Sequence, residues 1–184
     1  MRKIPTLFQR NMDDHLVRDE VTPGCEWVLG GEGIATRKWD GTACQVKGGQ
    51  LFKRYDAKHG KLPQPDFEPA QEMPDLVTGH WPGWVPVSDG PEDRWLREAF
   101  SPDLPNGTYE CCGPKIQGNP ERLPGHVLLR HGDESFVVLD RSFAALRDYL
   151  RGFPFEGIVF HHKDGRMAKI KVRDFGFQRR MAQE

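Results

Sequence analysis

The chain has 184 residues and a formal net charge of −1 at pH 7, a size that suits one domain with a substantial core. Its apolar runs are far shorter than the roughly 20 residues that span a bilayer, and its first residues lack the apolar segment of a signal peptide. These features predict a cytoplasmic globular protein and exclude a membrane-spanning one.

The four cysteines and the basic residues bear on metal and phosphate binding. Cysteines stand at positions 25, 44, 111 and 112, without the Cys-x-x-Cys spacing of a zinc knuckle. Cys111 and Cys112 are expected to be reduced and to point to opposite faces of a strand. Basic residues gather between 47 and 61 and between 163 and 180. Such patches can bind phosphates even in a near-neutral chain, although charge alone favours a solvated charged face.

Short strands and glycine turns dominate the first third of the chain. Residues 34–38, 42–47 and 50–54 are predicted strands, with turns at Asp40-Gly41 and Gly48-Gly49. Residues 62–91 are rich in Pro, Gly and Asp, which predicts a long surface connection.

The remaining two thirds mix helices with strands. Pro91 opens a predicted short helix, and a clearer helix from about 142 to 151 carries Phe143, Leu146 and Leu150 on its inner face. Further strands are predicted at 108–112, 128–130, 136–139, 156–162 and 166–173. This mixture predicts an α+β fold built on antiparallel sheet, forming a single domain over residues 1–184.

The last two predicted strands form a hairpin whose geometry can be read from the sequence. Asp164-Gly165 predicts a two-residue turn, which places Ile158 opposite Lys171. Side chains alternate along strands, so Glu156, Lys169 and Lys171 are expected on one face. One acidic and two basic groups on one surface suit a phosphate site, and they equally suit cross-strand ion pairs with a structural role.

Lys38-Trp39-Asp40-Gly41 places a lysine on a tight turn directly after a predicted strand. Five elements follow it along the chain. In order, they are Arg54, Tyr109-Glu110, Cys112-Gly113-Pro114-Lys115-Ile116-Gln117-Gly118-Asn119-Pro120, Glu156-Gly157-Ile158-Val159 and Lys169-Ile170-Lys171. In this series the chain resembles the covalent nucleotidyltransferases, which include polynucleotide ligases and mRNA capping enzymes. The stretch from Cys112 to Pro120 looks specifically like that of an ATP-dependent RNA ligase. The resemblance covers residues 24 to 175 and implies an ATP-grasp-like nucleotidyltransferase core.

The resemblance implies that Lys38 attacks the α-phosphate of ATP and carries AMP as a phosphoramidate. The AMP then passes to a 5′-phosphate RNA end, and a 3′-hydroxyl end displaces it to seal the strand. Asp40 would orient the loop and nucleotide, Gly41 would allow close backbone approach, and Arg54 would bind the ribose or the incoming 5′-phosphate. A lysine is nucleophilic only as the neutral amine, which neighbouring cations such as Arg37 favour.

The resemblance also assigns roles in metal and phosphate binding to the acidic residues and to the remaining basic residues. Glu110 would contact the ribose or support the metal shell, and Glu156 would hold Mg²⁺ or Mn²⁺. Lys169 and Lys171 would bind the α-phosphate and stabilise charge in the transition state. Further candidates for contacts to substrate phosphate are Arg37, which stands where RNA ligases often carry an acidic residue, Lys115 and Gln117.

Other positions leave alternatives open. Only residues 176–184 follow the last strand, too few for the C-terminal OB-fold domain of DNA ligases and capping enzymes, so a minimal core is expected. The candidates to bind the β- and γ-phosphates instead are Arg2, Lys3, Arg10 and Arg18. Trp27, Trp39 and Phe160 either stack on a base or pack in the core, and the adjacent His161 and His162 are expected to be structural.

The expected function is RNA ligation in repair. An adenylyl- or guanylyltransferase without efficient sealing and a non-catalytic nucleotide- or RNA-binding module are the alternatives.

Overall fold

The computed structural model describes residues 1–76 and 78–180. The chain forms two compact units, one from residues 1–3 and 40–130 and the other from residues 4–39 and 131–184. We call them the first and second unit. The chain passes from the second to the first between Trp39 and Asp40, directly after the Lys38 position. That the two units act together as a single domain stays a prediction.

Both units consist mostly of antiparallel strands with a few short helices, which confirms the α+β class. The narrower expectation of an ATP-grasp-like nucleotidyltransferase core stays a prediction. Among the described helices, none has both the length and the apolar character to cross a membrane. All four cysteines are buried and carry free thiols, as expected for Cys111 and Cys112.

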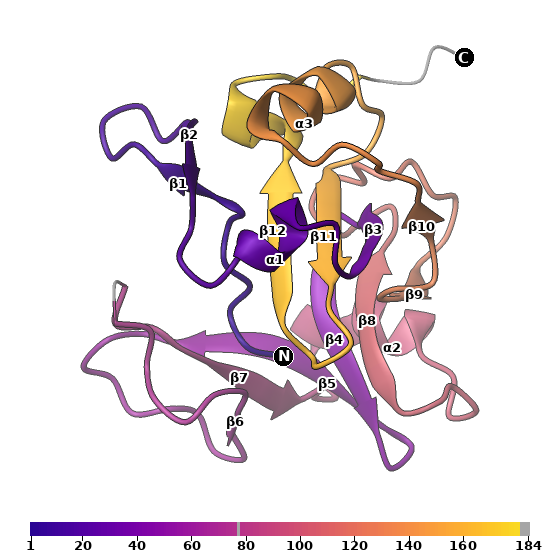
Figure 1. The fold of residues 1–184 in the computed structure, drawn as a ribbon. Coiled ribbons are helices and arrows are strands. Elements are labelled where there is room, and N and C mark those ends of the chain that lie inside the picture. The colour runs from indigo at the N-terminus through magenta and orange to yellow at the C-terminus, as the bar shows by residue number, and fades with distance from the viewer. Residues whose placement is uncertain (77, 181–184) are drawn as a thin grey trace. The chain divides into compact units, whose positions relative to one another are not determined.

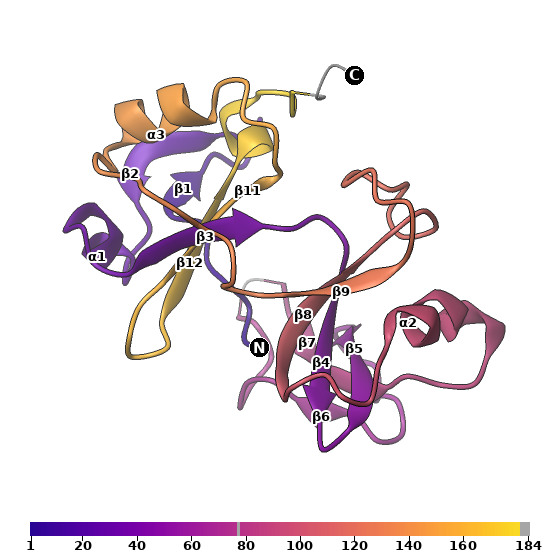
Figure 2. The same cartoon turned by 90° about the vertical axis from the view of Figure 1, so that its right-hand side faces the viewer.

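The first unit contains a six-stranded sheet with the order β6-β7-β5-β4-β8-β9. Its strands are labelled in Figure 2. Its strands are β4 (Thr42–Lys47), β5 (Gln50–Ala57), β6 (Glu68–Pro69), β7 (Trp81–Pro86), β8 (Gly107–Cys112) and β9 (Val127–Arg130). A 3₁₀ turn, η1 (Pro91–Asp93), leads into the predicted short helix, α2 (Arg94–Ala99). The sheet brings β8 beside β4, the strand that follows Lys38 along the chain.

The prediction of a long surface connection over 62–91 was wrong in its second half. β7 lies inside the sheet and pairs with β5 along its whole length. Prolines and a glycine in the strand Trp81–Pro86 hid it, because these residues ordinarily mark strand ends or bulges. The two-residue β6 pairs only with Gly83 and Trp84, so Pro82 and Pro86 lie beyond that ladder. At Gly83 an added Cβ would lie 2.2 Å from the Phe67 ring, which explains the glycine.

The second unit contains a four-stranded antiparallel sheet with the order β10-β3-β11-β12. Its strands are β3 (Ile34–Lys38), β10 (Ser135–Phe136), β11 (Gly157–His161) and β12 (Met167–Lys171). The other elements of this unit are the ribbon β1 (Phe8–Arg10) and β2 (Val17–Val21), the helices α1 (Glu26–Leu29) and α3 (Phe143–Leu150), and the 3₁₀ turn η2 (Val172–Phe175). Figure 1 shows β3, β11 and β12 side by side, with α3 at one end of them. β10 is shorter than the predicted strand 136–139.

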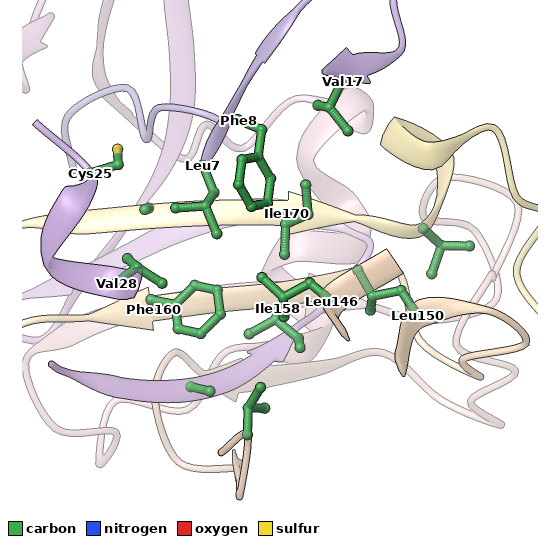
Figure 3. Packing of buried hydrophobic residues seen from close by; sticks show 14 of the residues in the cluster. Leu7, Phe8, Val17, Cys25, Val28, Leu146, Leu150, Ile158, Phe160 and Ile170 are labelled. Atoms are coloured by element: carbon green, nitrogen blue, oxygen red, sulfur yellow. The ribbon is translucent and has the colours of Figure 1, made fainter. Parts of the chain in front are cut away.

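One face of this sheet forms the core of the second unit. Ile158 and Phe160 of β11 and Ile170 of β12 pack with Leu7 and Phe8 from the N-terminal segment (Figure 3). The predicted helix is present as α3, and its inner-face residues Leu146 and Leu150 join the same cluster. The Ser142 hydroxyl accepts a hydrogen bond from the backbone N–H of Ala145 and so caps that helix. Lys169 and Lys171 alternate with Ala168 and Ile170 along β12, so they lie on the opposite face of the sheet.

The predicted register of the β11–β12 hairpin was wrong by one residue. The backbone N–H of His162 donates to the carbonyl of Arg166, so the loop has three residues. Gly165 at its end has a φ of +90°, the left-handed conformation that three-residue loops use to close a hairpin. Gly157 therefore pairs with Lys171, and Val159 pairs with Lys169. Ile158, expected opposite Lys171, instead faces the core.

Candidate active site

Three neighbouring strand ends bring two lysines together on the non-core face of the second unit's sheet. Lys38 is the last residue of β3 and pairs with Gly157, the first residue of β11. Gly157 also pairs with Lys171, the last residue of β12. Side chains in register across a sheet share one face. Gly157 adds no side chain between Lys38 and Lys171.

A single carboxylate joins the two lysines. The Nζ of Lys38 lies 2.6 Å from Oε2 of Glu156, and the Nζ of Lys171 lies 2.5 Å from Oε1. Glu156 precedes the first residue of β11, so strand alternation does not fix its direction. The expected grouping of Glu156 with Lys171 is therefore confirmed although the register that predicted it was wrong. The Glu156 side chain is only 13% exposed, so the pairing takes place largely away from water.

The neighbouring charges decide how Glu156 ionises. Burial raises the pKa of this carboxyl group, but the attraction of Lys38 and Lys171 outweighs burial and leaves the pKa below its ordinary value. Glu156 is thus a carboxylate at neutral pH. Its lowered pKa makes it a weak base, which suits holding an amine in place better than removing a proton from it.

Lys169 stands beside this cluster without a carboxylate of its own. Its backbone pairs with Thr6 and its strand neighbour is Val159. Within residues 1–76 and 78–180 it forms no ion pair. Burial and then the charges of Lys171 and Lys38 lower its pKa to about 8, with Glu156 opposing and Arg10 adding to the shift. Two amines thus pair with one carboxylate while the charge of a third acts on the same cluster, and this excess of positive charge favours an anion such as a phosphate group.

A buried carboxylate anchors the end of β12. Oδ2 of Asp174 accepts the backbone N–H of Lys171 at 2.9 Å, and its Oδ1 accepts Nη2 of Arg10 at 2.5 Å. Asp174 is 2% exposed. Sequence reasoning missed it, although a carboxylate three residues after a strand end is a recognisable cap for the following turn. The contact places Arg10, one of the four basic residues considered for the pyrophosphate, in the same unit as the lysines.

The other basic N-terminal residues have different partners. Lys3 pairs with Asp75 in the first unit, and Arg18 pairs with Asp14 on the surface of the second unit. A role in pyrophosphate binding stays a prediction for Arg2, Lys3, Arg10 and Arg18 alike.

Two carboxylates hold the connection that follows Lys38. In the first unit, Oε1 of Glu121 accepts the backbone N–H of Asp40 at 3.0 Å, and Oε1 of Glu110 accepts that of Gly41 at 3.1 Å. A Cβ on Gly41 would lie 2.2 Å from the carbonyl oxygen of Cys111. The close backbone approach expected of Gly41 therefore exists toward β8. Contact of Glu110 with a ribose or metal, and of Asp40 with a nucleotide, stay predictions.

Arg37 has a structural environment. Its guanidinium lies 3.4 Å from the centroid of the Trp39 ring and 3.6 Å from that of Phe155. Nη1 also pairs with Glu134 at 3.1 Å. By strand alternation Arg37 projects from the face opposite Lys38. These contacts favour a role in holding Trp39, and its predicted contact with substrate phosphate stays untested.

The remaining predicted residues lie in the first unit. Arg54 binds Asp56 through Nε at 2.8 Å and the carbonyl of Met1 through Nη1 at 2.6 Å. Lys115 and Gln117 are exposed on the loop after β8, and the backbone N–H of Lys115 donates to Nε2 of His126. Their contacts with ribose or phosphate stay predictions.

The aromatic and histidine side chains have structural contacts, and base stacking by Trp39 stays a prediction. Phe160 and Trp27 belong to the core of the second unit, and Trp39 stacks on Arg37. His162 binds Glu32 and Asp164, and these hydrogen bonds raise its pKa. Burial, followed by the charge of His131, lowers the pKa of His161.

Glu156 has the donor chemistry that Mg²⁺ requires, since carboxylate oxygens are its usual protein ligands. Both of its oxygens face lysine amines, so a magnesium ion would compete with Lys38 and Lys171 for them. Among the residues that the structure describes, no group of three or more His, Cys, Asp or Glu side chains is arranged to hold a metal. Mg²⁺ commonly uses one or two carboxylates together with substrate phosphates, and Glu156 fits that pattern.

Replacing Gly157 with alanine is expected to destabilise the second unit. An added Cβ would lie 2.2 Å from the carbonyl oxygen of Ile170 and 2.7 Å from Cα of Lys171, both backbone atoms that cannot rotate away. We expect a loss of about 2–4 kcal/mol in the free energy of unfolding, measured by urea titration. Gly125→Ala is the control, because its added methyl group would meet no atom within 4 Å. Equal stability of the two variants would contradict the tight packing at Gly157.

Comparison with known proteins gives a distant relationship. The chain is similar to RNA ligase 1 of the mouse, Mus musculus, with 27% identity over 221 aligned positions that cover 78% of this chain and 67% of the mouse protein. No family model matches the chain. The match covers most of the chain.

Proposed function

We propose that this chain is an ATP-dependent RNA ligase that joins 5′-phosphate and 3′-hydroxyl ends through a lysyl-AMP intermediate. The observation that carries the proposal is the pairing of two lysine amines with Glu156, with Lys38 at a strand end and Lys169, whose charge acts on the same cluster, lacking an ion pair among the described residues. The distant similarity to an RNA ligase supports it. A protein that only bound nucleotide would need the positive charge but would have no use for a nucleophile.

In the first step, the lone pair of the Lys38 Nζ forms a bond to the α-phosphorus of ATP. The bond from that phosphorus to the bridging oxygen breaks, and pyrophosphate leaves with the electron pair. Glu156 Oε2 orients Nζ at 2.6 Å. Because Glu156 is a weak base, we assign the displaced proton to solvent.

Fixed cations lower the barrier of such a transfer. Negative charge grows on the oxygens of the α-phosphate, and Lys169 and Lys171 are the residues proposed to stabilise it. Preorganised groups of this kind contribute several kcal/mol each. Glu156 is the residue we propose to hold Mg²⁺ or Mn²⁺, which when bound neutralises charge on phosphate oxygens.

The second and third steps transfer AMP and seal the strand. An oxygen of the RNA 5′-phosphate attacks the α-phosphorus, and the phosphorus–nitrogen bond breaks to regenerate the Lys38 amine. The 3′-hydroxyl oxygen then attacks the 5′-phosphorus, and AMP leaves. Arg54, Lys115, Gln117 and Arg37 are the residues proposed to contact the nucleotide or RNA phosphates. The ends required are those of a broken strand, so we place the reaction in RNA repair.

Incubation with α-labelled ATP and magnesium tests the proposal. We expect label that survives denaturation, maps to the peptide containing Lys38 and disappears when 5′-phosphorylated RNA is added and sealed. Label from GTP alone would indicate a capping-type transferase, and label without sealing would indicate an adenylyltransferase. Absence of an adduct with either nucleotide in folded protein would leave a binding module and overturn the proposal.

A further inference from the structure

The basic residues near the C-terminus form two separate groups in the second unit. Lys163 and Arg166 lie in the loop between β11 and β12, at the end of these strands away from Lys171. The other group lies on α3 and on the segment that follows β12, and it consists of arginines alone. Figure 1 shows α3 and the loop between β11 and β12 at opposite ends of the strands. The members of this second group that we call the arginine surface are Arg147, Arg151, Arg173 and Arg180.

The segment after β12 is fastened to the loop that joins α3 to β11. The backbone N–H of Arg180 donates to the carbonyl of Phe153 at 3.2 Å, and Nε of Arg179 donates to the carbonyl of Pro154 at 2.6 Å. This loop runs directly into Glu156, the carboxylate that joins two of the lysines. The arginines of the segment are therefore held beside the end of the sheet that carries the lysine cluster.

Arg151 and Arg180 come together at Gly152. A Cβ added to Gly152 would lie 3.9 Å from Cδ of Arg180, so the Arg180 side chain passes over the residue next to Arg151. The guanidinium of Arg151 lies 4.9 Å from the centroid of the Phe177 ring, which belongs to the same C-terminal segment. Phe177 is only partly buried. The pair thus combines two cations with a partly exposed aromatic ring.

The positive charge of the arginine surface is only partly balanced. Oδ1 of Asp148 lies 3.2 Å from Nε of Arg147 and 3.8 Å from Nη2 of Arg151. These three side chains are between 43% and 64% exposed, and ion pairs in water contribute little. Within residues 1–76 and 78–180, Arg173 and Arg180 are exposed and form no ion pair. One carboxylate paired with two of four guanidinium groups leaves a surface that attracts anions.

The arginine surface begins next to the candidate active site. Arg173 stands two residues after Lys171 in the chain. Burial is the largest cause that lowers the pKa of Lys171, and the charge of Arg173 adds to this effect. The backbone N–H of Phe177, whose ring lies beside Arg151, donates to the carbonyl of Val172 in the same turn as Arg173. Cations therefore continue from the lysines past Arg173 to the end of α3, and such a row fits a polyanion better than a single phosphate group.

We propose that the arginine surface binds the phosphate backbone of a single-stranded stretch of the RNA, next to the end that reacts. This inference rests on the proposed function, which makes RNA the substrate. Guanidinium groups bind phosphate oxygens through two parallel hydrogen bonds, and bases stack on exposed aromatic rings such as that of Phe177. An acidic protein segment would match the charge but has no bases for that ring. Backbone contacts carry no sequence information, so we expect RNA of any sequence to bind.

Fluorescence anisotropy of a labelled single-stranded RNA, measured without ATP over a range of salt concentrations, tests the surface. The double variant Arg151→Gln/Arg180→Gln is expected to bind at least about 10-fold more weakly at low salt, because two charged phosphate contacts are lost. Its plot of log affinity against log salt concentration should be flatter by about 1.4, since each phosphate contact of a single strand contributes about 0.7. Lys163→Gln/Arg166→Gln removes the same charge from the same unit at the opposite end of the strands and should bind RNA like the wild type.

Formation of the ATP adduct separates this surface from the chemistry. The adduct forms without RNA, so both double variants should be labelled at the wild-type rate. Sealing by Arg151→Gln/Arg180→Gln should be slow at low RNA concentration and should recover at saturating RNA. Equal RNA affinities in the two double variants would overturn the arginine surface and leave the ligase proposal in place. Absence of an adduct in folded wild-type protein would overturn the ligase proposal, while the measured affinities still decide whether the arginine surface binds RNA.

Discussion

Replacing Lys38 with arginine is expected to abolish the covalent adduct while leaving the protein folded. Arginine keeps a positive charge that can pair with Glu156, now 2.6 Å from the lysine amine. Its guanidinium has a pKa above about 12 and offers no neutral amine for attack on phosphorus. We therefore expect adduct formation from labelled ATP to fall at least about 10⁴-fold, the scale seen when a nucleophile is removed.

The same substitution elsewhere in the second unit is the control. Lys163 lies exposed in the β11–β12 loop, so Lys163→Arg should form the adduct at the wild-type rate. Thermal unfolding of Lys38→Arg should match that of the wild type, because the ion pair with Glu156 persists. An adduct that survives in Lys38→Arg, or label that maps to another lysine, would assign the nucleophile elsewhere.

The sequence predicted the strands on either side of Asp40-Gly41 correctly because strong local signals agree there, and strands 34–38 and 42–47 lie as expected. The turn predicted between them was wrong, because β3 and β4 belong to different sheets and residues 39–40 form an irregular connection. The strand β7 was missed because pairing with β5 outweighs the unfavourable propensity of its prolines and glycine. Propensity is a local property, while the stability of a strand depends on neighbours that are distant in sequence.

The charge cluster shows how a correct grouping can come from a wrong register. A one-residue difference in loop length moved Ile158 to the core face, yet Glu156 still meets Lys171 because it lies outside the strand. Sequence alone gave no signal for Glu121, since its partner is a backbone N–H about 80 positions away along the chain. Contacts between a side chain and a distant backbone group leave no spacing that a reader of the sequence can recognise.

Replacing Lys169 with methionine is expected to lower adduct formation and raise stability at neutral pH. Methionine retains much of the side-chain volume but removes a cation proposed to stabilise the α-phosphate, which costs about 10²–10³-fold in rate. Burial and the charges of Lys171 and Lys38, with a contribution from Arg10 and against that of Glu156, lower the pKa of Lys169 to about 8. The folded protein thus bears an energetic cost for keeping this amine charged.

The pH dependence has a definite sign. Below pH 8, Lys169 is protonated in both the folded and unfolded states, and the cost is present in full. Between pH 8 and 10.5, the ordinary value for lysine, the folded state has released a proton that the unfolded state still binds. The free energy of unfolding should therefore rise through this range by on the order of 3 kcal/mol. Part of the rise belongs to Lys171, whose pKa burial also lowers.

Urea unfolding at pH 7, 8, 9 and 10 measures both effects. Lys169→Met should be more stable than the wild type at pH 7 and should show a flatter rise, while exposed Lys163→Met should follow the wild-type curve. A lysine kept for packing would lose stability on replacement and leave catalysis intact. Lower stability at pH 7 with an unchanged adduct rate would therefore remove Lys169 from the site. Gain of stability with loss of rate is the result expected of a residue whose charge is retained for an anionic ligand.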